Sequence, residues 1–377
     1  MRDICEPLLA WLEEGRECAV AVVVDTWSSA PRPAGTMMAV DRAGEAIGSL
    51  SGGCIEGAVH ALALEVMESR SAQIAHYGIS DDEAFGVGLA CGGTLDVCVV
   101  PVTDPAALIA FLHAVRAESP AALALRLPAD PAGSAPGDAL GGGSPWLAIP
   151  VEDATVGGLG HPRLDAHVAE DARGLLTAGS TRVREYDSTG RRLGGGTRVL
   201  IVVSAAPPRL LVYGAIDYAR ALAGLGRFLG YRVTVCDARP VFATAARFPE
   251  AHEVIARWPH DHLAAEISAG RVDPSTVVAV LTHDLKFDVP VLAAALRADV
   301  GYVGALGSRR THALRLAGLR EAGLSEEELG RLRAPIGLDL GARTPEATAV
   351  SIFAEVLRDA SGATGLPLTS GAGPIHR

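Results

Sequence analysis

The chain has 377 residues, of which 49% are hydrophobic and 20% charged, and its formal net charge is −11. This composition is typical of a folded protein and excludes a largely disordered chain, while the length predicts two or three domains of roughly 100–200 residues each. A net negative charge repels phosphate backbones and anionic lipid. We therefore expect neither nucleic acid nor a membrane surface as a partner.

The six cysteines are spread along the chain and form no C-x-x-C pair, so a disulfide framework or a zinc site is not expected. The opening stretch MRDICEPLLAWLEEG carries acidic residues where a signal peptide would have an uninterrupted apolar segment. No apolar run approaches the roughly 20 residues that a membrane span needs. These features predict a cytoplasmic protein with reduced thiols.

Residues 1–104 alternate apolar runs with glycine-rich turns, which predicts an N-terminal α+β domain. The expected elements are helices over 4–14 and 55–69 and strands over 18–24, 37–40, 46–50 and 95–100. In the second helix Ile55, Val59, Leu62 and Val66 recur at helical spacing. They form an apolar stripe that would pack against the sheet.

Residues 105–208 give weaker signals. A helical run near 105–117 is followed by a stretch rich in proline, glycine and serine at 128–144, and a strand-like run closes the segment at 197–203. The middle stretch is a loop by composition. The sequence shows no internal repeat, and we expect an α+β region that connects two domains.

From residue 209 to the end, short β-rich runs alternate with helical patterns. The runs lie at 209–215, 231–239, 276–284 and 301–308, with helices at 217–229 and 288–297 between them. Such alternation predicts βαβ units and a parallel sheet covered on both faces. The fold class is therefore α/β, with the N-terminal α+β domain followed by a Rossmann-like, doubly wound domain over 209–377.

The first βα turn of this last domain carries half of a dinucleotide fingerprint. Gly214 and Ala219 are in register with G-x-G-x-x-G/A, but Ile216 stands where the second glycine lets the backbone approach a pyrophosphate. Asp217 adds negative charge and is a candidate helix cap. Asp237, about 20 residues on, is either a ribose ligand or a solvated turn residue. We therefore expect a Rossmann-like fold in which this loop does not bind NAD in the usual position.

Other polar residues follow the strands of the same sheet, at the edge where open α/β sheets bind ligands. His283 and Asp284 follow one strand, and Gly307, Ser308 and Arg309 follow another. A Gly-Ser turn that enters a helix beside arginine is a plausible anion cradle. The plainer interpretation makes Ser308 a helix cap and His283 a strand-end side chain. Two such strand ends in one sheet favour a ligand pocket.

Two thiols lie beside glycine pairs in the N-terminal domain. Cys54 follows Ser51, Gly52 and Gly53 at the start of the 55–69 helix, where free amides and the helix dipole favour a thiolate. It is a candidate nucleophile, sulfur carrier or soft metal ligand. Glu56 is either a first-turn acid or a proton acceptor.

Cys91 precedes Gly92 and Gly93 in a similar arrangement. Small buried cysteines beside glycines are common, so core packing is the alternative for both Cys54 and Cys91. Cys18, Cys98 and Cys236 lie within apolar strand runs and are expected to pack in the core.

Several long segments follow one another in a recognisable order. They are SSAPRPAGTMM (28–38), GSLSGGCIEGAV (48–59), AFGVGLACGGTLDV (84–97), LLVYGA (210–215), YRVTVCDARPVFATAARFP (231–249), VLTHDLKFDVPVL (280–292), YVGALGSRR (302–310) and PIGLDLGARTPEATAVSIFAEV (335–356). Together they resemble the XdhC/CoxI family of xanthine dehydrogenase accessory proteins over most of the chain.

The resemblance implies a maturation factor rather than an enzyme that turns over a substrate. Its members look like chaperones that bind the molybdenum cofactor and hold it while a cysteine desulfurase supplies a sulfido ligand. They then insert it into the large subunit of a molybdenum hydroxylase, and they are often dimeric. Carried over by position, Cys54 and Cys91 become candidate molybdenum ligands, and the adjacent glycine amides would cradle the pterin phosphate.

The candidate cofactor-binding residues are therefore Ser51, Gly52, Gly53, Cys54, Glu56, Cys91, Gly92, Gly93, Gly214, Asp237, His283, Asp284, Gly307, Ser308 and Arg309. The alternative function is an NAD(P)-dependent oxidoreductase that uses the Rossmann-like domain, although Ile216 and Asp217 disfavour NAD(P). A third possibility is an interaction scaffold whose thiols are structural.

Overall fold

The computed structural model describes residues 2–27, 32–78, 94–128, 144–187, 189–192 and 195–370. The chain divides into two compact units, one over Met1–Ala206 and the other over Pro207–Gly371. No helix within the described ranges combines the length and the apolar character that crossing a membrane requires.

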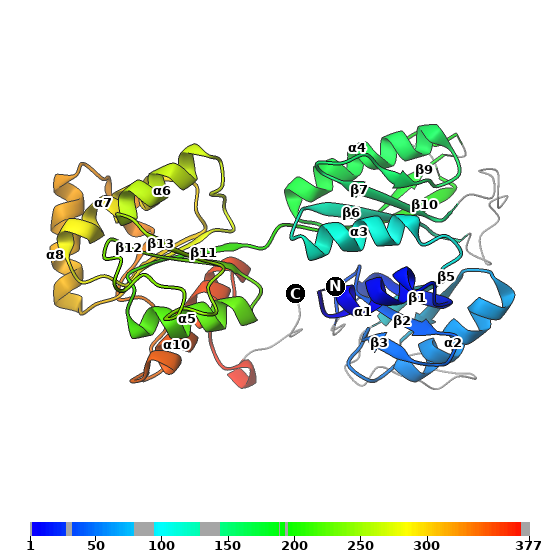
Figure 1. Ribbon diagram of the computed structural model, residues 1–377, viewed down its shortest axis with the longest axis horizontal. Coiled ribbons are helices and arrows are strands. Elements are labelled where there is room, and N and C mark those ends of the chain that lie inside the picture. Colours follow the sequence, from blue (N-terminus) through cyan, green and yellow to red (C-terminus); the bar gives the residue numbers. More distant parts are fainter. Residues whose placement is uncertain are drawn as a thin grey trace. The chain divides into compact units, whose positions relative to one another are not determined.

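The first unit begins with a five-stranded antiparallel sheet of order β3-β2-β1-β5-β4 (Figure 1). Its elements are α1 (Arg2–Glu13), β1 (Cys18–Trp27), β2 (Met37–Asp41), β3 (Ala46–Gly48), α2 (Glu56–Ser69), β4 (Gln73–Tyr77) and β5 (Thr94–Pro101). The valine-rich β1 is central because its side chains are apolar on both faces, as a strand covered on both sides requires.

The second half of this unit repeats the same topology. Its elements are α3 (Ala106–Arg116), β6 (Ala121–Arg126), β7 (Trp146–Pro150), β8 (Val156–Gly157), α4 (Pro162–Ala178), β9 (Arg182–Tyr186) and β10 (Thr197–Ser204). The strands form a five-stranded sheet of order β8-β7-β6-β10-β9, which matches the first sheet element by element. The unit is thus a structural duplication, although the sequence shows no repeat.

The two halves share one apolar core. Leu8 of α1 and Phe111 of α3 belong to the same buried cluster as Val22 of the first sheet and Leu123 of the second. On its other face the first sheet is covered by α2, and the second sheet by α4. The two helices α1 and α3 therefore contribute to a single interior that both sheets need.

The second unit holds a six-stranded sheet, parallel throughout, of order β13-β12-β11-β14-β15-β16. Its elements are β11 (Arg209–Tyr213), α5 (Asp217–Phe228), β12 (Arg232–Asp237), β13 (Glu253–Ala256), α6 (Pro259–Ser268), β14 (Val277–Val280), α7 (Leu285–Arg297), β15 (Tyr302–Ala305), α8 (Arg309–Glu321), α9 (Glu326–Gly330), β16 (Leu332–Arg333), α10 (Pro345–Ser361) and the short η1 (Leu368–Ser370).

This is the strand order of dinucleotide-binding folds, and it confirms the predicted Rossmann-like sheet. Helices α5 and α10 cover one face and α6 to α9 the other (Figure 1). The direction of strand progression reverses between β11 and β14. Ligands of such sheets bind in the crevice at this point, beyond the carboxyl ends of the strands.

Candidate functional site

A loop between β3 and α2 carries Ser51, Gly52, Gly53 and Cys54, and the carboxylate of Glu56 lies at its centre. Glu56 accepts hydrogen bonds from the backbone nitrogens of Ser51 (2.8 Å), Gly52 (3.0 Å) and Gly53 (2.8 Å). The hydroxyl of Ser51 donates to it over 2.7 Å. Further donors are the backbone nitrogens of Leu50 and Ile55 and the hydroxyl of Ser49. The side chain thus fills a nest of amides with negative charge.

These contacts change the chemistry of Glu56. Burial of the carboxylate raises its pKa, but the hydrogen bonds from Ser51 and Ser49 outweigh this and hold the pKa of Glu56 well below its usual range. The glycines make the nest possible, since Gly52 has φ +82° and Gly53 φ +118°. Their amides, predicted to cradle a phosphate, already donate to Glu56. We therefore expect the loop to position Cys54 and the phosphate to bind elsewhere.

Cys54 is partly exposed, and its backbone nitrogen donates to the Ser51 hydroxyl over 3.0 Å. The other cysteines in the described part of the chain are buried, as predicted for Cys18, Cys98 and Cys236. Burial raises the pKa of Cys18 to about 11 and those of Cys98 and Cys236 to about 12. Among the described thiols Cys54 is therefore the one that a ligand can reach.

Three predicted site residues, Cys91, Gly92 and Gly93, lie outside the described residues. Thr94, which follows them, begins β5 opposite Trp27, the last residue of β1. Within the described ranges no group of three or more His, Cys, Asp or Glu side chains is arranged to hold a metal ion. Cys54 is the one partly exposed cysteine in these ranges, and its thiol is a soft donor that suits a soft metal centre.

In the second unit the glycine turn after β11 contacts two other segments of the chain, at Thr282 and at Asp237. An added Cβ on Gly214, which has φ +116°, would lie 3.0 Å from the backbone nitrogen of Thr282. The next amide, of Ala215, donates to Asp237 over 2.8 Å. Asp217 is the first residue of α5 and not its cap, because Ile216 occupies the cap position without a side-chain hydrogen bond. Gly214 therefore serves close strand packing.

Asp237 is 3% exposed, which excludes the solvated turn residue considered above. Besides Ala215, it accepts hydrogen bonds from the backbone nitrogen (2.9 Å) and side chain of Arg239. Burial raises its pKa, but the hydrogen bonds from Arg239 and Ala215 outweigh this and lower the pKa of Asp237. Both carboxylate oxygens accept hydrogen bonds within the chain, and Asp237 thereby fixes the glycine turn.

A pocket of about 660 Å³ lies beyond β14 and β15 and brings together His283, Gly307 and Arg309 from the predicted set. The neighbouring candidates are helix caps: Asp284 accepts from the backbone nitrogen of Lys286 and caps α7, and Ser308 accepts from that of Thr311 and caps α8. The plainer interpretation was therefore right for Ser308.

The far wall of this pocket is the loop 335–342, which the sequence analysis did not assign to a site. The Glu355 carboxylate holds the loop by accepting from the backbone nitrogen of Gly337 over 2.8 Å and from the Tyr302 hydroxyl over 2.6 Å. Gly337 has φ +99° and leaves no room for a side chain, since an added Cβ would lie 2.5 Å from the Ser351 hydroxyl. The two glycines of the segment PIGLDLGA (335–342) were the sequence signal from which this loop could have been predicted.

A buried ion pair supports the other wall. Arg315 is fully buried, and its Nε donates to the Asp288 carboxylate over 2.7 Å while Nη2 donates to the Thr282 carbonyl over 3.0 Å. Thr282 also donates its hydroxyl to Asp288. Burial raises the pKa of Asp288 despite these partners. The pair fixes α8 to the end of β14 and so positions Gly307, a role that sequence reasoning missed.

Two family models match the chain. The XdhC Rossmann domain matches residues 210–356, and the XdhC and CoxI family matches residues 11–78. The chain belongs to the XdhC/CoxI family. The family prediction made from the sequence is therefore confirmed, and the second match assigns the region that contains Cys54 to the family as well.

Relatives of the whole chain agree with this assignment. The molybdenum cofactor insertion chaperone PaoD of Escherichia coli (strain K12) is 29% identical over 92% of this chain and 84% of its own. A probable xanthine dehydrogenase subunit of Bacillus subtilis (strain 168) is 26% identical over 93% of this chain and 95% of its own. A crystal structure of a xanthine dehydrogenase from Bacillus halodurans has the same fold, with a TM-score of 0.66 and 23% identity over 97% of each chain.

Proposed function

We propose that this XdhC/CoxI protein is a chaperone that binds the molybdenum cofactor and inserts it into a hydroxylase of the xanthine dehydrogenase type. The accessible thiol of Cys54, on a loop fixed by Glu56, carries the proposal. The similarity to PaoD, which is named a molybdenum cofactor insertion chaperone, supports it.

The donor set fits such a cofactor. When bound, the cofactor supplies a soft metal centre, and a cysteine thiolate is the protein ligand that suits it. Glu56 and Ser51 hold the loop, so the backbone that carries Cys54 is fixed before a ligand binds. Coordination by one or two thiols fits transient binding, since release to a client then needs few bonds to break. We propose Cys91 as a second ligand.

The remaining parts of the proposal concern partners. We propose that a cysteine desulfurase sulfurates the held cofactor, that the client is the large subunit of a molybdenum hydroxylase, and that the protein acts in the cytoplasm as a homodimer. The pocket lined by His283, Gly307 and Arg309 is our proposed place for a nucleotide. The oxidoreductase alternative is disfavoured because Asp237 is engaged with Ala215 and Arg239.

The test is cofactor retention. Wild-type protein and Cys54→Ser are purified anaerobically from a host that makes the cofactor, and molybdenum is measured by mass spectrometry and pterin by fluorescence after oxidation. Near-stoichiometric pterin in the wild type and a clear loss in Cys54→Ser are expected. Equal thermal unfolding of the two proteins is the control. A folded wild type without pterin or molybdenum would contradict the proposal, and full retention by Cys54→Ser would remove Cys54 from it.

A further inference from the structure

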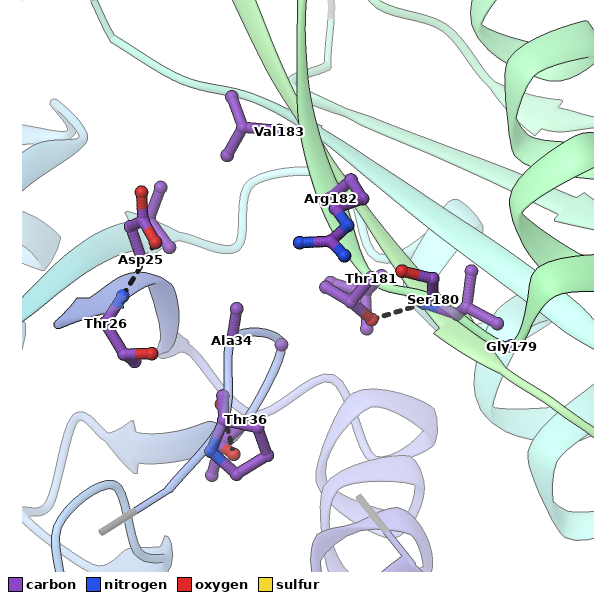
Figure 2. A pocket seen from close by; sticks show the side chains of 14 residues that line it. Asp25, Thr26, Ala34, Thr36, Gly179, Ser180, Thr181, Arg182 and Val183 are labelled. Carbon is purple, nitrogen blue, oxygen red and sulfur yellow. Dashed lines mark hydrogen bonds between the residues drawn. The ribbon is translucent and has the colours of Figure 1, made fainter. Parts of the chain in front are cut away.

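A second pocket lies within the first unit, where its two halves meet (Figure 2). Its volume is about 760 Å³, within the range of small-molecule sites. One wall consists of residues 24–26 and 33–36 of the first half, and the other of residues 179–183 and 202–203 of the second. Neither half of the duplication forms this pocket alone.

The two walls are in close contact at Gly35. An added Cβ on Gly35 would lie 3.0 Å from Cγ1 of Val202 and 3.2 Å from Cγ2 of Thr181, and its φ of +85° is one that side chains rarely adopt. Gly35 therefore lets the loop before β2 approach β10 at van der Waals distance. The pocket is shaped by this contact.

Opposite charges stand on the two walls. Asp25 comes from β1 and Arg182 from β9, both are exposed, and Figure 2 shows their side chains at different sides of the pocket. Within the described residues neither has an ion-pair partner at 4 Å or less, and Asp25 accepts only from the backbone nitrogen of Thr26, over 2.8 Å. A carboxylate oxygen and a guanidinium are thus available to a ligand.

The position of Asp25 follows from an irregularity in β1. The pairing of β1 with β5 shifts register between Val23 and Asp25, as at a β-bulge. In a regular strand consecutive side chains point to opposite faces, but a bulge changes the direction of one of them. Val24 and Asp25 both line the pocket. The bulge thereby brings a charge to a wall that regular pairing would leave apolar.

The pocket and the Cys54 loop lie on opposite faces of the first sheet, since Val24 of the pocket belongs to the core shared by the two halves and Cys54 packs against the cluster beneath α2. Thr36 lines the pocket and precedes Met37, the first residue of β2. Gly48, the last residue of β3, pairs with Met38 and leads into the loop that ends at Cys54. Both features therefore lie at the same end of the first sheet.

We propose that this pocket binds the phosphorylated pterin of the cofactor, with Arg182 paired to the phosphate and Asp25 accepting from the aminopyrimidinone edge. This inference rests on the proposed function and names the subsite. A pterin presents N–H groups on that edge, for which Oδ2 of Asp25 is an acceptor while Oδ1 holds the Thr26 amide, and a guanidinium matches a phosphate. The site supplies the phosphate partner that the amides held by Glu56 do not.

The experiment measures pterin binding by full-length protein with fluorescent probes. The probes are neopterin and neopterin monophosphate, which differ by one phosphate. The variants are Arg182→Ala and Asp25→Asn, with Arg184→Ala and Asp153→Asn as controls of matched charge at exposed positions outside the pocket. We expect wild type to prefer the phosphorylated probe by about tenfold, Arg182→Ala to lose that preference, and Asp25→Asn to weaken both probes by about tenfold.

The inference is overturned if wild type binds neither probe, or if the two pocket variants bind as the controls do. Cofactor retention in the same variants separates it from the proposed function. If both pocket variants retain as much cofactor as the wild type, the pocket is not the pterin site and the chaperone proposal stands. If probe binding depends on Arg182 and Asp25 but the wild type retains no cofactor, the pocket is a pterin phosphate site and the chaperone proposal is wrong.

Discussion

The carboxylate of Glu56 lies 2.8 Å from the backbone nitrogen of Gly53, so the first residue of α2 bonds back to the loop that precedes it. Amides at the start of a helix are the usual place for a bound anion. Here the anion is part of the chain. The loop is therefore ordered before any ligand arrives, and the thiol of Cys54 is presented by a preorganised backbone.

Replacing this carboxylate is expected to loosen the loop. In Glu56→Gln one acceptor oxygen becomes an amide donor facing the backbone N–H groups of the nest, so the free energy of unfolding should fall by about 1–3 kcal/mol. Cofactor retention should fall with it, because Cys54 loses its fixed position. Urea unfolding measures the first effect. The matched control is Glu65→Gln, an exposed position on the same helix, and an equal stability for both variants would contradict this account.

The acid range offers a second test of Glu56. Its pKa is lower in the folded protein than its ordinary value of 4.5, so the stabilisation is complete above that value and is lost as the pH falls through the lower folded pKa. Urea unfolding from about pH 6 to pH 3 should show the wild type losing its advantage over Glu56→Gln below about pH 4.5. A difference between the two proteins that stays constant across this range would disprove the linkage.

Alkylation should distinguish Cys54 from the other described thiols. Cys5, Cys18, Cys98 and Cys236 are buried, so iodoacetamide should modify Cys54 first in the folded protein. Peptide mass spectrometry after a short exposure measures this order, with urea-unfolded protein as the control in which all sites react. Bound cofactor should protect Cys54. Unchanged modification of Cys54 in cofactor-loaded protein would argue against contact between them.

The buried pair in the second unit predicts a large effect on stability. Arg315→Met leaves Asp288 buried without its cation and should lower the free energy of unfolding by about 3–5 kcal/mol. Adding Asp288→Leu should recover part of this loss, because no unpaired charge remains. Arg310→Ala, exposed at the start of α8, should change stability by less than about 0.5 kcal/mol. Additive effects of the two core substitutions would contradict the coupling.

Much of the fold could be predicted because each element has a periodicity of its own. The helix expected at 55–69 is Glu56–Ser69, and the strand expected at 18–24 extends over Cys18–Trp27. The duplication could not be predicted, because it lies in strand pairing and not in residue identity. The valine-rich β1 corresponds to AALALR in β6, and the two share only a short alternation of alanine with valine or leucine.

The site was harder to predict because its decisive contacts join residues to backbone atoms. Sequence reasoning expected Cys54 at the start of the helix, whereas it lies in the loop two residues before α2, and it treated the adjacent amides as free when Glu56 occupies them. Asp237 stood at ribose-binding spacing, and only the fold brings it to the amide of Ala215. The pocket between Asp25 and Arg182 joins segments far apart in the chain, which no local motif can reveal.

The shared core of the duplicated unit makes its two copies depend on each other. Leu8, Val22, Phe111 and Leu123 bury one another, so neither copy can be discarded without exposing the interior of the other. The outward-facing loops do not contribute to this core. Cys54 belongs to one copy and Arg182 to the other, so a ligand that contacts both residues requires both copies.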